Sequence, residues 1–415
     1  MTRPRVVITG LGAISPLGSS IDLYWNGLIN GRSGIRRITQ FDATDFPCQI
    51  AGEIPDFEPE LYLERKEARR IPRSAQIALA SAIQAVKDAG LPEIMANQER
   101  SGVVFGTAIG GVDKLDEGIN TLRTQGLSRV NPFIIPSGIS NLSAFLIARQ
   151  FQCLGPNCTI VTACATGTQT IGEAAELIRR GAVDVVISGG TESLIQDYSI
   201  AGFCAMRALP INYNDNPQAA SRPFDAKREG FILSEGAAAV VVESLEYALA
   251  RSAHIYAEIA GQASSTDAYH IAQPDPEAAG PIRAMRWALA DAGLSPQQID
   301  YINAHGTSTP LNDPTETRAI KSVFGDHAYK LAISSTKSMI GHAMGGSGAL
   351  EAVACVLTIE HGIIPPTINY TYPDPECDLD YIPNHAQKRT VNTTLSNSFG
   401  LGGQNACLVF KKYYD

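Results

Sequence analysis

The chain has 415 residues, of which 44% are hydrophobic and 18% are charged, and its formal net charge is −9. This length is sufficient for two domain-sized units with a substantial core. The acidic balance argues against a general nucleic-acid-binding protein, and no apolar run approaches the ~18 residues that a membrane-spanning helix needs. We therefore expect a soluble protein with neither nucleic acid nor a membrane as partner.

Short apolar runs alternate with helical segments along the whole chain. The runs that predict buried strands are residues 5–10, 102–107, 184–190, 237–244, 332–337 and 406–412. This alternation is the α/β pattern, in which strands are covered on both faces. The glycines and proline of the first run and its continuation, "VVITGLGAISPLG", favour a strand over a secretion signal.

The eight cysteines are scattered, without any Cys-x-x-Cys pair. Cys153 and Cys158 are the closest two, and no histidine lies near enough to them to suggest a zinc site. Dispersed cysteines without a secretion signal are typical of a reducing compartment, so we expect a cytoplasmic protein.

The segment "IVTACATGTQTIGEAAELIRR", residues 160–180, places a cysteine where the pattern changes. Residues 160–162 resemble the end of a strand, and from Ala165 onward apolar residues recur at helical spacing. Cys164 would then lie at the positive end of a helix, where the dipole and free N–H groups lower the pKa of a thiol. A small buried structural cysteine is the alternative.

A similar arrangement recurs in the second half, where the strand-like residues 331–337 lead to a helix dense in Gly and Ala. The recurrence predicts two similar halves, which we place at residues 1–252 and 253–415. The glycine-rich residues 341–348 match neither of the common phosphate-binding motifs, so a nucleotide is not expected.

Two histidines, His305 and His342, lie in loops at strand ends, where open α/β sheets bind their ligands. A cysteine with two neutral imidazoles suits acyl transfer followed by stabilisation of an enolate. Lys337 would add positive charge near His342 and Glu351 could balance it, although exposed positions are the usual place for both residue types. The basic stretch 64–73 is either a solvated helix face or a docking site for an acidic partner.

Four segments, "TACATGTQTIG", "NAHGTSTPLND", "STKSMIGHAMGGSGALEA" and "NSFGLGGQNA", resemble the signatures of elongating β-ketoacyl-acyl carrier protein synthases, type II. These ketosynthases belong to the thiolase superfamily, and the resemblance extends over essentially the whole chain. It implies an α/β, thiolase-like fold, in which two duplicated halves form a five-layer αβαβα sandwich. It also implies an acyltransferase, which condenses malonyl-acyl carrier protein, with loss of CO2, onto an acyl chain held on Cys164. The expected product is β-ketoacyl-acyl carrier protein in fatty acid elongation.

The resemblance also assigns roles to individual residues. Cys164 accepts the acyl chain, His305 and His342 promote decarboxylation, and Lys337 and Glu351 form a supporting ion pair. The backbone N–H groups of Cys164 and Leu401 form the oxyanion hole, and Leu401 occupies the position of an aromatic gate. The implied substrate-binding residues are Thr307, Thr309, Ile109, Phe203 and Phe399. The implied docking residues for the carrier protein are Lys66, Arg69, Arg70, Arg129 and Arg207. No metal and no cofactor are expected, because phosphopantetheine arrives on the carrier protein.

The chain departs from the usual family pattern at two places near the acyl entrance. Its "GLGGQN" loop carries Leu401 and Gln404, and Ala272 and Gln273 replace a more usual polar pair. A ketosynthase of a specialised polyketide or polyene pathway is therefore the main alternative. Such an enzyme often pairs with a chain-length factor, whereas an elongating synthase is expected to be a homodimer. Degradative thiolases fit less well, because they use a second catalytic cysteine that the "GLGGQN" loop lacks. Priming synthases pair one histidine with an asparagine, and His342 argues against that pairing. Chain-length factors lack the nucleophile, whereas Cys164 is present.

Overall fold

A ten-stranded sheet forms the centre of the computed structural model, which describes residues 3–414. The strands of its first half are β1 (Val6–Ile14), β4 (Ser101–Thr107), β5 (Asn157–Cys158), β6 (Val185–Glu192) and β7 (Gly236–Ser244). Those of its second half are β8 (Ala257–Thr266), β9 (Tyr301–Asn303), β10 (Ala332–Ser334), β13 (Thr393–Gly400) and β14 (Gln404–Lys411). Strands β1 and β6 are buried along their whole length, as their continuous apolar runs predict.

The two halves of the sheet repeat one topology. The sheet order is β10-β9-β13-β14-β8-β1-β7-β6-β4-β5, so each half has its strands in the order 3-2-4-5-1 when they are counted along the chain. In each half the fourth strand pairs parallel with the second and antiparallel with the fifth. The halves join where Val7 and Ile8 of β1 pair antiparallel with Glu258 and Ala257 of β8. The predicted internal duplication is therefore confirmed.

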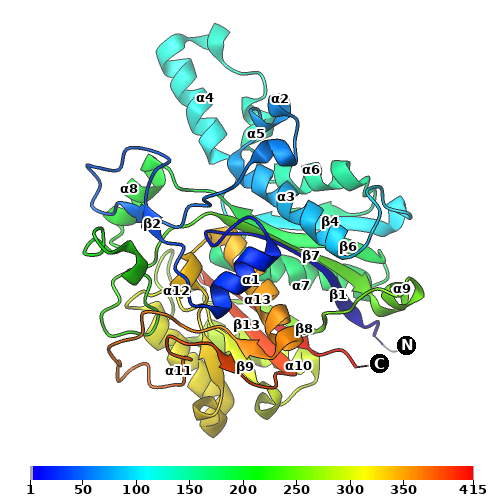
Figure 1. Ribbon diagram of the computed structural model, residues 1–415, viewed down its shortest axis with the longest axis vertical. Coiled ribbons are helices and arrows are strands. Elements are labelled where there is room, and N and C mark those ends of the chain that lie inside the picture. Colours follow the sequence, from blue (N-terminus) through cyan, green and yellow to red (C-terminus); the bar gives the residue numbers. More distant parts are fainter. Residues whose placement is uncertain (1–2, 415) are drawn as a thin grey trace.

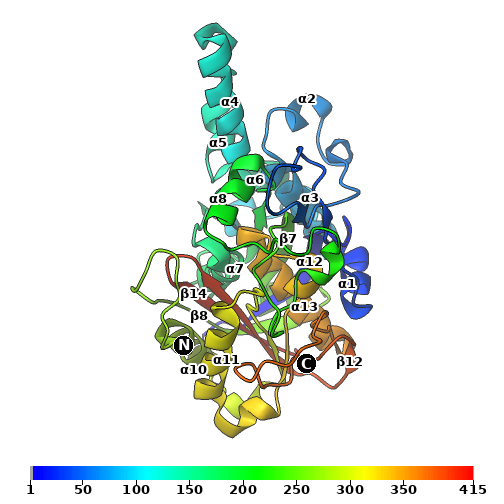
Figure 2. The ribbon, with the colours of Figure 1, turned by 90° about the vertical axis from the view of Figure 1, so that its left-hand side faces the viewer.

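Helices cover the two halves of the sheet in three layers (Figures 1 and 2). One outer layer holds α3 (Arg73–Asp88) and α6 (Leu142–Phe151), and the other holds α10 (Ala279–Ala292) and α11 (Asn312–Phe324). Between the half-sheets lie α7 (Thr166–Arg179) and α13 (Ser347–His361), which contact strands of both halves. A Cβ on Gly167 would lie 2.5 Å from the backbone nitrogen of Ala349, so glycine lets these helices approach closely. The result is the expected five-layer αβαβα arrangement.

The remaining elements surround this sandwich. The other helices are α1 (Ile21–Ile29), α2 (Arg65–Ala68), α4 (Val112–Gln125), α5 (Ile134–Gly138), α8 (Asp197–Ala205), α9 (Leu245–Ala250) and α12 (Lys337–Ile340). Two small antiparallel two-stranded sheets pair β2 (Arg36–Arg37) with β3 (Ile50–Ala51), and β11 (Ile363–Ile364) with β12 (Gln387–Lys388). Helix α4 projects well away from the body of the molecule (Figures 1 and 2). Within residues 3–414, no helix has the length and apolar character needed to cross a membrane.

Two strand predictions were too long. Residues 160–162 lie outside any strand, because the chain leaves the sheet after β5 and the Thr162 backbone N–H donates to Thr166 Oγ1 at 2.9 Å. The predicted strand 332–337 ends at Ser334, and Lys337 begins α12. In both places a turn replaces the last residues of the predicted strand. The first turn leads to Cys164, and the second leads to Lys337.

Candidate active site

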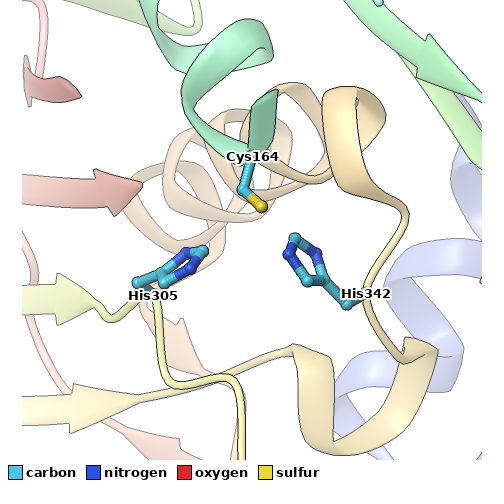
Figure 3. Close-up of side chains that lie close together, drawn as sticks. All are labelled: Cys164, His305 and His342. Atoms are coloured by element: carbon cyan, nitrogen blue, oxygen red, sulfur yellow. The ribbon is translucent and has the colours of Figure 1, made fainter. Parts of the chain in front are cut away.

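Cys164 lies in a single 3₁₀ turn, η4 (Ala163–Ala165), which leads into α7. The preceding Ala163 has a φ of +50°, a left-handed conformation that costs a non-glycine residue energy and is characteristic of functional turns. Figure 3 shows the sulfur directed between the rings of His305 and His342. The sulfur and one ring nitrogen from each histidine all lie within 4.8 Å of one another.

The thiol of Cys164 is 5% exposed, and burial raises its pKa to about 11. The backbone N–H of Leu401 and the charge of Lys337 both act in the opposite direction, but they do not compensate for the loss of water around the thiolate. The prediction of a lowered pKa was therefore wrong. Cys164 rests as a thiol and loses its proton only as it reacts.

His305 follows β9 and is held by its backbone. Glu316 of α11 accepts hydrogen bonds from the backbone N–H groups of His305, at 2.8 Å, and Gly306, at 2.7 Å. Lys337 Nζ donates to the His305 carbonyl oxygen at 2.7 Å and lies 3.4 Å from the His305 Nδ1. Because an ammonium group can only donate, Nδ1 is the acceptor and the ring proton is on Nε2.

His342 lies in the loop between α12 and the turn η8 (Met344–Gly346). Its backbone N–H donates to the Ile232 carbonyl at 2.7 Å, and its carbonyl accepts from the Ser234 N–H at 3.0 Å. The ring Nδ1 lies 2.8 Å from Ser347 Oγ, whereas the buried Nε2 has no hydrogen-bond partner within residues 3–414. That nitrogen is therefore available to a substrate.

The two imidazoles form one electrostatic unit with Lys337. Their ring centroids are 5.5 Å apart and their planes are nearly perpendicular, at 84°. Burial, and then the positive charge of Lys337, hold the pKa of both histidines well below the usual value. Both rings are thus neutral at physiological pH, as the proposed chemistry requires.

Lys337 and Glu351 form a buried ion pair behind His305, with side chains 1% and 0% exposed. Burial raises the pKa of Glu351, and the adjacent ammonium of Lys337 opposes that rise. Ser398 Oγ donates to the second carboxylate oxygen of Glu351 at 3.4 Å. The two residues therefore form the expected ion pair, and both side chains are buried, so the alternative of exposed surface positions does not apply.

A cavity of about 440 Å³ opens onto the three reactive side chains. Of the remaining residues predicted for the site, it is lined by Thr307, Thr309, Phe399, Leu401 and Arg207. The hydroxyls of Thr307 and Thr309 are 2.9 Å apart. Leu401 precedes two glycines with positive φ, so the loop turns sharply beside the Cys164 sulfur.

Two predicted substrate residues, Ile109 and Phe203, do not line this cavity. Ile109 is 40% exposed, at the loop after β4. Phe203 packs edge-on against Phe231 at 5.1 Å, and Phe231 in turn packs against the His342 ring at 5.4 Å. Neither residue therefore lines the open cavity, although Phe203 lies next to the site through Phe231.

The five predicted docking residues are all exposed cations, and none pairs with a carboxylate of residues 3–414. Lys66 lies in α2 and Arg69 ends that helix, while Arg129 ends the short turn η3 (Leu127–Arg129) before α5. The Arg70 guanidinium lies over the Phe133 ring, 4.9 Å from its centroid. Only Arg207 reaches the cavity itself.

Sequence reasoning missed Glu316, whose carboxylate fixes the His305 loop. It is fully buried, and it also accepts a hydrogen bond from Asn397 Nδ2 at 3.2 Å. Burial raises its pKa to about 6. In the sequence it lies in "DPTETR", which reads as an ordinary polar helix start and gives no signal of this role.

Comparisons with known proteins place this geometry in a family. The β-ketoacyl synthase N-terminal domain matches residues 3–248, and the β-ketoacyl synthase C-terminal domain matches residues 256–371. The chain belongs to the β-ketoacyl synthase family. It is an acyltransferase that forms a β-ketoacyl product by condensation, so the predicted family and enzyme class are confirmed.

Individual relatives agree with this assignment over the full length. The chain is 50% identical to the 3-oxoacyl-[acyl-carrier-protein] synthase 2 of Synechocystis sp., covering 100% of this chain and 99% of that protein. Among solved structures it resembles the ishigamide ketosynthase/chain length factor, with a TM-score of 0.93, 38% identity and all of both chains covered. It also resembles one chain of the structure "AntDE:AntF (apo): type II PKS acyl-carrier protein in complex with its ketosynthase bound to the hexaketide", with a TM-score of 0.91, 35% identity and all of both chains covered. The predicted fold class is confirmed, whereas the boundary at residue 252 stays a prediction.

Proposed function

We propose that this β-ketoacyl synthase condenses malonyl-acyl carrier protein with an acyl chain held on Cys164, in fatty acid elongation. The observation that carries the proposal is a buried thiol next to two neutral imidazoles, all three of which line a 440 Å³ cavity. The relative at 50% identity, named for the same reaction, supports it.

In the first half-reaction, the Cys164 sulfur attacks the thioester carbonyl of the acyl carrier protein. A new carbon–sulfur bond forms to Cys164, the bond to the phosphopantetheine sulfur breaks, and the thiol proton passes to that leaving sulfur. The N–H groups of Cys164 and Leu401 would bind the developing oxyanion, and such donors act strongly because they are already oriented.

In the second half-reaction, the malonyl thioester loses CO2, and the electron pair of the broken bond forms an enolate. The Nε2–H of His305 and the free Nε2 side of His342 would hydrogen-bond the enolate oxygen. The enolate carbon then attacks the acyl group, and the Cys164 sulfur leaves. That sulfur takes up a proton from water, which its high pKa favours.

We further propose that the reaction needs neither an organic cofactor nor a metal ion, because loss of CO2 generates the carbanion. The sulfur and the two ring nitrogens could also approach a metal ion, so treatment with a chelator tests this point. Full activity after the treatment is expected. A cytoplasmic location also stays a prediction, consistent with eight free cysteines.

A polyketide or polyene ketosynthase is the second candidate, because two similar structures are ketosynthases of that kind or include a chain length factor. Leu401, which has no aromatic ring, lies beside Cys164 and favours a wider acyl entrance. The identity of 50% to an elongating synthase, against 35–38% to those structures, favours fatty acid elongation. The chain-length profile of the purified enzyme distinguishes the two.

The partners we propose are the acyl carrier protein and a second copy of this chain. The projecting α4 and the segment after it expose large apolar side chains, which the second protomer of a dimer would cover. These exposed residues are Ile119, Leu122, Leu127, Phe133, Ile135, Ile139 and Phe145. Native mass spectrometry should show a homodimer. A stable monomer would indicate that a different subunit, such as a chain-length factor, covers this face.

The direct test of the mechanism is mass spectrometry of the enzyme after incubation with an acyl carrier protein substrate. One acyl adduct on Cys164 is expected, and Cys164→Ala should abolish condensation while some malonyl decarboxylation remains. Cys158→Ser, at the exposed cysteine, is the matched control and should behave as wild type. An adduct on another cysteine would refute the assignment.

A further inference from the structure

Glu192, the last residue of β6, has a carboxylate that none of the roles above uses. Its side chain is 0% exposed, and it forms no ion pair with a cation of residues 3–414. A buried carboxylate without a cation is costly unless hydrogen bonds satisfy it. Burial accordingly raises its pKa, although four donors act in the opposite direction.

The four donors come from two separate segments. Thr107 Oγ1, at 2.8 Å, and the N–H groups of Ala108, at 2.6 Å, and Gly110, at 3.2 Å, belong to the end of β4 and the loop after it. The fourth donor is the N–H of Gly345 in η8, at 3.3 Å. Glu192 therefore joins the loop after β4 to the turn that follows His342.

Both segments pack against the apolar cluster that contains Cys164, the loop after β4 through Ala108 and the turn through Met344. Ile109 lies between two of the donors, and Met344, next to Gly345, lines the cavity. Met344 belongs to the same apolar cluster as Cys164, and it has a φ of +42°, a strained conformation that its surroundings must hold.

The packing around Gly345 leaves no room for adjustment. A Cβ at this position would lie 2.4 Å from the Ala108 nitrogen and 2.9 Å from a Glu192 oxygen. The two segments are thus in direct contact, and the carboxylate supplies the acceptors for the N–H groups between them. A displacement of either segment would move Ile109 relative to Met344.

We propose that Glu192 is a positioning residue that fixes the loop after β4 against the turn after His342, and thereby limits which acyl chains Cys164 accepts. The proposal rests on the proposed function, since it treats Met344 as a wall of the acyl site and the loop that carries Ile109 as the support behind it. It requires no contact between Glu192 and the substrate.

Glu192→Gln tests the proposal, because it replaces one carboxylate oxygen with an NH2 group of the same size. Oε2 serves Ala108 and Gly345, whereas Oε1 serves Thr107 and Gly110. The Thr107 hydroxyl can rotate to accept, so the NH2 group will face Thr107, and the Gly110 N–H will lose its acceptor. The loop carrying Ile109 should loosen, while His342 stays in place.

The measurement compares the rates at which Cys164 is acylated by long-chain and short-chain acyl carrier proteins, with malonyl decarboxylation measured in parallel. Glu192→Gln should raise the long-to-short ratio about tenfold, the scale expected for an unsatisfied buried donor, and leave decarboxylation unchanged. Glu243→Gln is the matched control: this carboxylate is also 0% exposed, but it binds Thr9 and Arg251 away from the cavity. It should lower the thermal midpoint and leave the ratio unchanged.

Two outcomes overturn the proposal directly, and a second variant covers the case in which Glu192→Gln does not fold. An unchanged ratio in Glu192→Gln means that the carboxylate is only structural, and an equal shift in Glu243→Gln means that the ratio follows general destabilisation. If Glu192→Gln does not fold, Thr107→Val, which removes one donor and keeps the carboxylate, must shift the ratio in the same direction. If wild-type Cys164 forms no acyl adduct, the proposed function fails instead, so the two failures are distinguishable.

Discussion

Burial of the Cys164 thiol leads to a quantitative prediction about its reactivity. With a pKa of about 11, roughly 10⁻⁴ of the thiol is ionised at pH 7. An ordinary thiol with a pKa of about 8.5 is about 3% ionised, so Cys164 has roughly 300-fold less thiolate at pH 7. Because a thiolate of higher pKa is intrinsically more nucleophilic, the reaction of Cys164 with a small alkylating reagent should be slower by roughly 30-fold. Its rate constant should increase about tenfold per pH unit between pH 7 and pH 10.

The assay measures iodoacetamide addition to Cys164 by mass spectrometry, at several pH values and in a Cys158→Ser background. Circular dichroism at each pH confirms that the protein remains folded. A plateau of the rate constant near or below pH 8 would refute the reasoning, because it would mean that the helix end and Lys337 stabilise the thiolate more than burial destabilises it.

The same shift has a consequence for stability. A thiol whose pKa is higher in the folded state stabilises the fold fully below the pKa of the unfolded thiol, near 8.5, and this contribution is lost as the pH rises towards 11. The free energy of unfolding should therefore decrease over this range, and the decrease should be smaller in Cys164→Ala. An equal decrease in both proteins would contradict the assigned pKa.

Three further predictions concern the histidines, the basic patch and the gate. His305→Ala and His342→Ala should each slow malonyl decarboxylation by about 10²–10³, the usual cost of one oxyanion donor, and near-normal turnover of the double variant would refute the paired role. Charge reversal at Arg69 and Arg70 should raise the KM for carrier-protein substrates but not for small thioester analogues, and less so at high salt; equal effects on both would make the patch structural. Leu401→Phe should narrow the acyl range and suppress CO2 release by the unacylated enzyme, whereas unchanged profiles would show that leucine fills the same slot.

Much of the site could be predicted because its chemistry is concentrated in short segments. The helix that begins after Cys164 and the position of His305 after a strand are local patterns that survive folding, whereas Thr162 lies outside any strand and His342 follows α12. Resemblance to a family supplied the pairing of Lys337 with Glu351, which the structure shows as a buried contact.

The features that sequence reasoning missed depend on distant parts of the chain. The raised pKa of the Cys164 thiol reflects its burial in the folded chain, which the local helix signal does not contain. Glu316 and Glu192 look like ordinary polar residues until the fold places their carboxylates against backbone N–H groups. The end of β5 was misplaced because Thr162 has high strand propensity but its N–H bonds to a side chain.

Because the two halves repeat one strand order, the turn that carries Cys164 has an equivalent turn in the other half. The turn η4 before α7 contacts β13 of the other half, and the turn η8 before α13 contacts β6 in the equivalent way. Cys164 lies in the first turn and Gly345 in the second, so the duplicated scaffold contains two related niches. In the second niche the N–H of Gly345 points at Glu192, a carboxylate of the protein itself. The two equivalent turns therefore serve different purposes in this chain: the first carries the thiol of Cys164, and the backbone N–H of the second is bound by the carboxylate of Glu192.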